Sequence, residues 1–328
     1  TTTATDGVAS AMDAVILPPG PRFAAAKVNL ALHVVGRRDD GYHLLESLVV
    51  FDDIAGDTVM ATPRASGNDG ERDGEDASAG GRVDRLIVEG RFASAVPAGG
   101  DNILLAAAAL ARKIMQDFGR SLPPLDIHLT KTLPVAAGIG GGSADAAALI
   151  DLVSGDLPQD ARAALAAAAI RLGADVPMCI AGRPARITGI GETIEPVAAM
   201  PKLAMLLVNP GIAVETATVF RMLARRDNPP MPPVPSGGFA ATDDLVAFLS
   251  ECRNDLALAA GSLAPGIEMA RARLIEAGAL FARMSGSGAT VFGLYADDDA
   301  ALRAARAIRE HHPDWWLSRG QAMEGSQT

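Results

Sequence analysis

The sequence predicts a mixed α and β fold arranged as two lobes that divide near residue 195. Segments with the period-two alternation of strands take turns with Ala- and Leu-rich helical segments, and no internal repeat occurs. Of the 328 residues, 49% are hydrophobic, which is enough for a sizeable core. We expect a flexible arm over residues 1–20, an N-terminal lobe over 21–195, a C-terminal lobe over 196–316 and a tail over 317–328.

The first elements expected along the chain are two strands. Apolar residues alternate with polar ones over 28–34, which predicts a half-buried strand with Lys27, Asn29 and His33 on one face. A second strand is expected over 44–51.

An acidic, glycine-rich stretch over 66–81 follows and predicts a solvated loop, because it has almost no apolar side chains to bury. It opens at Asp69 like a calcium-binding loop. The position that must carry a bidentate Glu is Gly80, however, so we expect no calcium there.

The rest of the chain alternates helices, strands and turns. Asp101 or Asn102 is expected to cap the first helix. The predicted helices cover 103–115, 143–153, 160–172, 267–277 and 297–311; the strands cover 125–129, 203–208 and 289–295; and the proline-rich stretch 229–235 is a stiff surface linker.

Composition excludes several classes of protein. The net charge is −10, which disfavours nucleic acid as a partner, because binding to nucleic acid depends on neutralising phosphates. No apolar run is long enough to span a bilayer, and residues 1–20 lack the pattern of a secretion signal. Cys179 and Cys252 are not spaced for a zinc site or a disulfide framework, so a reducing cytoplasm fits best.

The most informative motif is a run of glycines. Gly138 and Gly140–Gly142 stand directly before a predicted helix that carries Ser143 in its first turn. Glycines let consecutive backbone N–H groups converge on an anion, and the helix start adds its own free N–H groups and positive dipole end. The run therefore predicts a phosphate-binding loop, although it fits neither the Walker pattern nor the dinucleotide pattern. The alternative is a tight turn needed only for packing.

A second glycine-rich stretch lies before the last predicted strand. It contains Ser285, Gly286, Ser287 and Gly288, whose amides could close over the same phosphates. A serine-glycine hairpin turn explains the stretch equally well.

Three further positions carry candidate chemistry, each with an ordinary alternative. Lys27 and Asn29 could receive a phosphate or a reacting hydroxyl, or form an exposed strand face. An Asp-Gly turn could present Tyr42 and His43 to a planar base, or Tyr42 could fill the edge of the core. Asp175, between a helix end and a strand-like run, could be catalytic or a helix cap.

In this order the segments resemble the GHMP kinases over residues 22–315. The resemblance implies the two-lobed α+β fold of that superfamily, with the active site in the cleft between the N-terminal and C-terminal lobes, and ATP with Mg²⁺ as the phosphoryl donor. The segments that carry it are Ala26–Leu30, Gly41–Ser47, Asp101–Leu104, Leu133–Ala147, Leu172–Pro177, Arg253–Leu256 and Met284–Phe292.

The resemblance is closer to members that phosphorylate the 2-hydroxyl of a cytidine diphosphate ester of methylerythritol, in the non-mevalonate route to isoprenoids. It implies that Asp175 takes the hydroxyl proton with Lys27 beside it, and that the remaining roles are divided as follows. Tyr42 and Phe220 would sandwich the cytosine, His43 would read its edge, Asn29 and Thr216 would lie near the methylerythritol and its phosphates, Asn102 would belong to the adenine region, and the ATP phosphates would meet Pro134, Ala137, Gly138, Ile139, Gly140, Gly141, Gly142, Ser143 and Ala144.

The metal ligands stay open in this comparison. Position 144 is Ala where relatives often carry a second serine, which leaves Ser143 as the candidate, and no Glu matches. Two other functions also stay open: another GHMP kinase of the homoserine or mevalonate type, and an inactive nucleotide-binding regulator. The expected partners are the small-molecule substrate and ATP, without nucleic acid or membrane, and the expected state is a monomer or homodimer in the cytoplasm.

Overall fold

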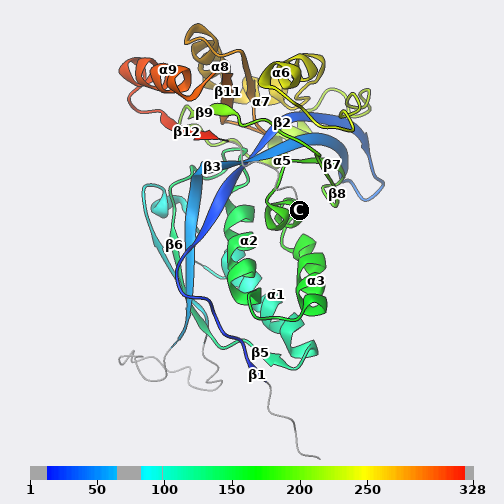
Figure 1. Cartoon of the computed structure of the whole chain (residues 1–328), viewed down its shortest axis with the longest axis vertical. Helices are drawn as coiled ribbons and strands as arrows, with labels where there is room; N and C mark the ends of the chain where they lie inside the picture. The colour runs from blue at the N-terminus through cyan, green and yellow to red at the C-terminus, as the bar shows by residue number, and fades with distance from the viewer. Residues whose placement is uncertain (1–12, 65–82, 98, 322–328) are drawn as a thin grey trace, which may run out of the picture.

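The computed structural model describes residues 13–64, 83–97 and 99–321 of the chain. Within them, a six-stranded sheet and a four-stranded sheet form the framework, and helices pack on each (Figure 1). The larger sheet uses strands from the first 196 residues and the smaller one uses strands from residue 204 onward. The described chain therefore has the two-lobed, mixed α and β arrangement that the sequence predicts.

The larger sheet is organised by its two longest strands, β2 and β3, which pair antiparallel. β3 pairs with β7 through its first half and with β6 through its last half, so it joins the two ends of the sheet. The order is β4-β6-β3-β7-β8, with β2 on β3. The strands are β2 (Arg22–Arg37), β3 (His43–Pro63), β4 (Arg85–Glu89), β6 (Leu125–Thr130), β7 (Ala185–Gly189) and β8 (Thr193–Pro196).

The smaller sheet is antiparallel throughout, in the order β10-β11-β9-β12. From residue 242 onward, the helices of the C-terminal part lie together at the end of the molecule drawn at the top of Figure 1. The strands are β9 (Ala204–Asn209), β10 (Phe281–Met284), β11 (Val291–Tyr295) and β12 (Trp316–Gln321), and the helices are α5 (Thr216–Arg221), α6 (Thr242–Glu251), α7 (Ala257–Leu263), α8 (Gly266–Glu276) and α9 (Asp298–His311).

The helices of the N-terminal part pack beside the larger sheet. α2 contacts α1, α4, β2 and β3, so it is the central helix of this part. Two short 3₁₀ turns, at Ala93–Ala95 and Ala169–Arg171, complete it. The helices are α1 (Ile103–Asp117), α2 (Gly141–Ser154), α3 (Gln159–Ala168) and α4 (Val176–Ala181).

The hydrophobic core joins the two parts. One cluster packs α1 and α2 on the larger sheet, and another packs α8 and α9 on the smaller sheet. A third cluster contains Val28 and Leu30 of β2 together with Met205 and Leu207 of β9 and Leu245 of α6. Because this cluster takes side chains from both sheets, the two parts are joined by a common hydrophobic core.

The predicted half-buried first strand is wrong: β2 is buried on both faces. Lys27, Asn29 and His33 are no more than 5% exposed, as are the apolar residues between them. The apolar face packs against the C-terminal part, because Val28 and Leu30 belong to the cluster shared with β9 and α6. The pairing with β3 shifts register near residues 25–27, 29–31 and 34–36. The polar face is enclosed as well, because Lys27 and Asn29 line a cavity and His33 bonds to backbone groups of the C-terminal part.

Two predicted end segments are also corrected. In the described part of the expected arm, β1 (Asp13–Ala14) pairs with β5 (Arg120–Ser121), and Val15 is buried. The expected tail begins inside β12, which pairs with β9 from residue 316 to 321. The expectations for residues 1–12, the acidic stretch 66–81 and 322–328 lie outside the described residues.

Most predicted central elements are confirmed. The helices expected over 103–115, 143–153, 267–277 and 297–311 are α1, α2, α8 and α9, and the helix expected over 160–172 is α3 with the 3₁₀ turn after it. The proline-rich linker lies on the surface except for Met231, which is buried in the shared cluster. None of the helices in the described ranges has both the length and the apolar character that crossing a membrane requires.

Candidate active site

The glycine run forms a loop between β6 and α2, as the sequence predicts. Gly138 and Gly140 have φ angles of +72° and +64°, in the left-handed region that favours glycine. A Cβ on Gly138 would lie 2.4 Å from the carbonyl oxygen of Ser285, so no larger residue fits. No side chain caps the start of α2, and its first N–H groups have no partner within the helix. The loop and helix start can therefore bind an anion.

The second glycine-rich stretch is both a hairpin turn and part of the site. It joins β10 to β11, and the Ser285 hydroxyl donates to the carbonyl of Gly138 at 2.9 Å. The same hydroxyl accepts from the backbone N–H of Asn29 at 3.0 Å. Ser287 Oγ lies 2.8 Å from Thr216 Oγ1. The second loop thus supports the first and reaches the C-terminal side of the cavity.

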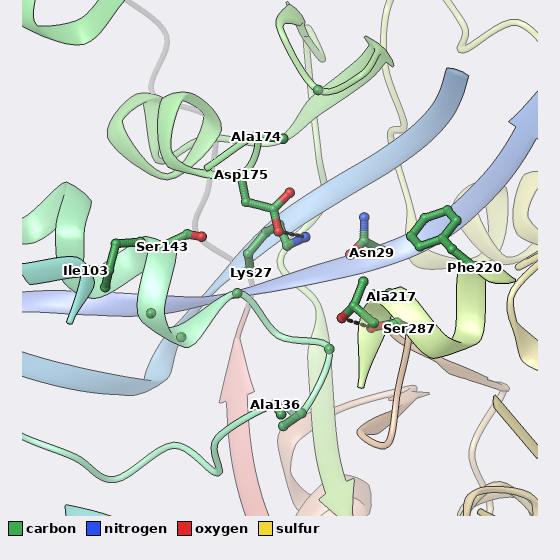
Figure 2. Close-up of a pocket in the computed structure, with 18 of the residues that line it drawn as sticks. Lys27, Asn29, Ile103, Ala136, Ser143, Ala174, Asp175, Ala217, Phe220 and Ser287 are labelled. Carbon is green, nitrogen blue, oxygen red and sulfur yellow. Dashed lines mark hydrogen bonds and ion pairs between the residues drawn. The ribbon is translucent and has the colours of Figure 1, made fainter. Parts of the chain in front are cut away.

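A cavity of about 1160 Å³ opens between these loops and receives residues from both sheets (Figure 2). Four predicted site residues do not line the cavity. The side chains of Ile139 and Ala144 are buried in the core, and Ser285 and Gly288 are absent from the lining. The predicted site residues that do line it are Lys27, Asn29, Tyr42, His43, Asn102, Pro134, Ala137, Gly138, Gly140, Gly141, Gly142, Ser143, Asp175, Thr216, Phe220, Gly286 and Ser287.

Lys27 and Asp175 form an ion pair inside this cavity. Lys27 Nζ lies 2.8 Å from Asp175 Oδ2, and the two side chains are 6% and 39% exposed. Figure 2 shows the pair between Ser143 on one side and Phe220 on the other. Asp175 precedes the helix α4 rather than a strand, and its carboxylate does not cap that helix. The helix-cap alternative is therefore wrong, and the carboxylate is left for the cavity.

The aromatic residues gather at the other end of the cavity from the glycine run. Tyr42 is 59% exposed, so the alternative in which it fills the core is wrong. The His43 ring stacks on Phe220 with centroids 4.8 Å apart. Burial, then the charges of Arg37 and Arg226, lower the pKa of His43, so its ring is neutral near pH 7. Its buried Nε2 has no hydrogen-bond partner among the described residues.

Asn29 has an unused acceptor beside this ring pair. Its amide nitrogen donates to Ser47 Oγ at 2.8 Å, whereas its buried Oδ1 has no described donor. A buried polar atom without a partner is rare in folded proteins, and a ligand commonly completes it. Asn29 and His43 therefore both favour a polar ligand in this part of the cavity.

Asn102 begins α1 and is confirmed as its cap. Its Oδ1 accepts from the N–H of Leu104, and its amide nitrogen donates to the carbonyl of Pro97, both at 2.8 Å. Asn102 lines the cavity near the glycine run but is only 5% exposed.

Sequence reasoning missed a buried charge cluster below the glycine run. Lys131 Nζ lies 2.5 Å from Asp57 Oδ2 and 2.7 Å from Asp145 Oδ2. Burial raises the pKa of Asp145 to about 7. Burial alone would lower the pKa of Lys131, but the two carboxylates outweigh it and raise that pKa. The sequence held one indication of this cluster. Every second residue of β6 is buried, beginning at Leu125, and Lys131 occupies the next position of that series.

Chemically, the cavity combines an anion-binding loop, a lysine–carboxylate pair and an aromatic pocket. Among the described residues, no group of three or more His, Cys, Asp or Glu side chains could hold a metal ion. Mg²⁺ does not require such a group, because it usually keeps one or two protein ligands and completes its shell with water and phosphate oxygens. Ser143 is the hydroxyl that lines the cavity at the helix start.

Comparisons with known proteins agree with this geometry. The family model for the GHMP kinase N-terminal domain matches residues 102–183, and the model for the GHMP kinase C-terminal region matches 241–314. Among solved structures, a 4-(cytidine 5'-diphospho)-2C-methyl-D-erythritol kinase is 31% identical with a TM-score of 0.70, covering 93% of this chain and 100% of its own.

More distant structures show the fold alone. A homoserine kinase from Cytophaga hutchinsonii is 17% identical with a TM-score of 0.62, over 93% of this chain and 96% of its own. The mevalonate kinase of L. major is 16% identical with a TM-score of 0.57, over 95% and 98%.

Two curated relatives extend the similarity over nearly the whole chain. The 4-diphosphocytidyl-2-C-methyl-D-erythritol kinase of Cereibacter sphaeroides is 47% identical over 90% of this chain and 96% of its own length. The kinase of the same name from Brucella melitensis is 47% identical over 91% and 94%. With this identity over this length, and with a lysine–aspartate pair between the glycine loop and an aromatic pocket, the chain belongs to the 4-diphosphocytidyl-2-C-methyl-D-erythritol kinase family of the GHMP kinases.

Proposed function

We propose that this enzyme transfers the γ-phosphoryl group of ATP to the 2-hydroxyl of 4-diphosphocytidyl-2-C-methyl-D-erythritol, giving ADP and the 2-phosphate. The observation that carries the proposal is the position of the Lys27–Asp175 pair. It lies between a loop built to bind phosphates and a pocket whose aromatic rings and unpartnered polar atoms suit a pyrimidine. The product would be an intermediate in the non-mevalonate supply of isoprenoid precursors.

Asp175 is the proposed general base. Its half-exposed carboxylate can accept the proton of the substrate hydroxyl as the oxygen attacks the γ-phosphorus. Lys27, held on a buried strand 2.8 Å away, orients that carboxylate and offsets the negative charge of the phosphoryl group. Phosphoryl transfer has a loose transition state, so positioning and charge stabilisation supply most of the catalysis.

The glycine loop is the proposed ATP phosphate site. The backbone amides between Ala137 and Ala144, with Pro134 at the loop entry, would surround the β- and γ-phosphates, and the dipole of α2 would add to their attraction. Mg²⁺ neutralises charge on the phosphate oxygens when bound, and Ser143 would hold it together with those oxygens. Asn102, at the start of α1, would border the adenine.

The aromatic end is the proposed cytidine site. Tyr42 and Phe220 would enclose the cytosine, and the free Nε2 of His43 would read its polar edge. Asn29 Oδ1 and Thr216, which Ser287 supports, would contact the methylerythritol and its phosphates. The substrate would then reach from the aromatic end, where its cytidine binds, to the Lys27–Asp175 pair in the middle of the cavity, where its hydroxyl reacts.

The proposal includes the cytoplasm as the compartment, where ATP is supplied and where the two free thiols, Cys179 and Cys252, stay reduced. The partners would be ATP and the cytidyl substrate only, and the protein would act as a monomer or homodimer.

Release of ADP from Mg-ATP tests the function directly. The assay compares the cytidyl substrate at saturation with homoserine and mevalonate. We expect turnover only with the cytidyl substrate. Turnover with homoserine or mevalonate instead would keep the kinase and reject the specificity, and no turnover with any acceptor would favour an inactive nucleotide-binding regulator, against which the retained Lys27–Asp175 pair argues.

A further inference from the structure

Only some of the basic side chains that line the cavity form ion pairs with described carboxylates. In the described ranges there are five of them, and three face carboxylates: Lys27, Lys131 and Arg221, the last 3.6 Å from Glu215. The other two, Arg37 and Arg226, form no ion pair with a described carboxylate. The cavity therefore contains two guanidinium charges whose counter-ion the described part of the protein does not supply.

These two arginines lie at the same end of the cavity, although they come from opposite lobes. Arg37 ends β2, and its Nε donates to the carbonyl of Gly41 at 3.2 Å. Arg226 follows α5, and one of its terminal nitrogens donates to the carbonyl of Arg221 at 3.4 Å. Gly41 is two residues before His43 and Arg221 directly follows Phe220, and the rings of His43 and Phe220 stack, so both guanidinium groups lie at the aromatic end of the cavity. Both charges also lower the pKa of His43.

Arg226 also has an unused donor. Its Nε is buried and has no acceptor among the described residues. A guanidinium group only donates hydrogen bonds and stays charged at all physiological pH values, so an anion is the partner that satisfies both its charge and its donors. Forked donors of this kind match the geometry of phosphate oxygens.

The two ligands proposed for this cavity each carry a chain of phosphates, and the two chains occupy different places. The triphosphate of ATP is assigned to the glycine loop, on the far side of the Lys27–Asp175 pair from the aromatic rings. The diphosphate of the second substrate joins the cytidine, beside those rings, to the methylerythritol. Its negative charges need cations at the aromatic end, and Arg37 and Arg226 are the unpaired cations described there.

We infer that Arg37 and Arg226 bind the diphosphate of the cytidyl substrate, one from each lobe, and so select a nucleoside diphosphate ester over a free nucleoside or a free polyol. This inference rests on the proposed function. The competing role is donation to the carbonyl edge of cytosine. A neutral base edge would leave both charges without a counter-ion, and His43 Nε2 is already available to that edge.

The test uses the full-length protein with Arg37→Gln and Arg226→Gln, and Arg225→Gln as the matched control. Arg225 precedes Arg226 but is paired with Asp227 at 3.0 Å and does not line the cavity. Calorimetric titration with CDP and with cytidine separates the phosphate from the base. We expect each cavity variant to weaken CDP binding by about tenfold or more while changing cytidine binding by less than about twofold. The control should match the wild type with both ligands.

Kinetics of the same variants complete the test. KM for the cytidyl substrate should rise by a similar factor, with kcat and KM for ATP nearly unchanged, and Arg226→Lys should restore part of the loss because it keeps the charge without the fork. Equal weakening of CDP and cytidine would overturn the inference in favour of base recognition, and unchanged CDP binding would overturn it outright. Absence of turnover by the wild type would instead count against the proposed function, because the CDP and cytidine titrations do not depend on turnover.

Discussion

Asp175 differs from the other carboxylates of the cavity in how its charge is used. Asp145 is buried against Lys131, Asp40 is paired with Arg38 at 2.7 Å, and Asp101 is exposed at the rim. Asp175 alone combines an ion pair to the nearly buried Lys27 with a partly exposed oxygen in the centre of the site. A carboxylate that is held in place yet still reachable meets the geometric requirement for a general base.

Replacing Asp175 by Asn should therefore remove the base and keep the shape. We expect kcat to fall by at least about 10²-fold, with ATP binding largely intact, because general-base catalysis contributes on that order. The control is Asp151→Asn, which removes a carboxylate that also pairs with a basic residue of β2, Arg22, but lies outside the cavity. Turnover close to the wild-type rate in the Asp175 variant would rule out the assigned role.

Tyr42 offers a second test at this scale. Because Tyr42 is 59% exposed and buries little surface against the protein, Tyr42→Ala should leave Tm unchanged. Stacking of an aromatic ring on a base contributes about 1–3 kcal/mol, so KM for the cytidyl substrate should rise roughly tenfold or more. Phe118→Ala is the control, a partly exposed ring away from the cavity. An unchanged KM would remove Tyr42 from the cytidine site.

At the scale of elements, the two glycine loops behave as one unit. Gly138→Ala would place a methyl group 2.4 Å from the Ser285 carbonyl oxygen, at a φ of +72°. Left-handed backbone costs about 1–2 kcal/mol for an L-residue even without a clash. We expect Tm to fall by roughly several degrees. KM for ATP should rise, because both loops must shift to make room for the methyl group.

Gly142→Ala is the matched control for that substitution. Gly142 lies in the first turn of α2, and its nearest contact would be Ile103 Cγ2 at 3.8 Å, an ordinary distance. Since Ala is favoured over Gly in helices by about 1 kcal/mol, Tm should stay the same or rise. Equal destabilisation by the two substitutions would show that the glycines serve packing in general rather than one loop-to-loop contact.

The cluster of Lys131, Asp57 and Asp145 links β6, β3 and α2, and it predicts a pH dependence. The pKa of Asp145 is about 7 in the folded protein, against an ordinary value of 3.8. Between these two pH values the folded protein keeps a proton on Asp145 that the unfolded chain has released. The folded state of the wild type therefore loses stability as pH rises through this window, whereas Asp145→Asn does not titrate.

Thermal unfolding of both proteins at about pH 5 and about pH 8 measures this difference. We expect the free energy of unfolding of Asp145→Asn, relative to the wild type, to be larger at the higher pH by about 1–3 kcal/mol. Groups that titrate in both proteins cancel in the comparison. A difference that does not change with pH would show that Asp145 is ionised throughout.

At the scale of the whole molecule, the cavity depends on both sheets at once. Its walls include residues of β2 and α2 and, from the C-terminal part, of α5 and the β10–β11 turn. The shared apolar cluster also joins the two sheets. Arg283 strengthens the junction, because it donates to the carbonyls of Leu30, Leu249 and Cys252. Lobes that share a core should not unfold separately.

We therefore expect one cooperative unfolding transition for the chain. Both tryptophans lie near the C-terminal end, with Trp316 in β12, so their fluorescence reports the smaller sheet, while far-ultraviolet circular dichroism reports all elements. The two signals should give coincident curves, and the calorimetric and van't Hoff enthalpies should agree. Separate midpoints would contradict this expectation and indicate lobes that fold independently.

Local signals predicted the elements that depend on neighbouring residues. The Ala-rich helices α1 and α2, the cap at Asn102 and the glycine loop follow from spacing and backbone preference within a few residues, and they are confirmed. Short elements were not predicted. The helix α4 has six residues and contains Pro177, so its pattern is too brief to separate from a strand.

The sequence by itself determined that this chain carries a glycine loop before a helix, a strand with Lys27 and Asn29, and a turn with Tyr42 and His43, because those features depend on residues close together in the chain. The tertiary structure alone decided that β2 is buried on both faces, that Lys27 meets Asp175 across 148 positions, and that Lys131 lies between Asp57 and Asp145. It also placed Arg37 and Arg226, from opposite lobes, in the lining of one cavity. Contacts between distant segments depend on how sheets and helices pack, and the local pattern of apolar and polar residues does not record that packing.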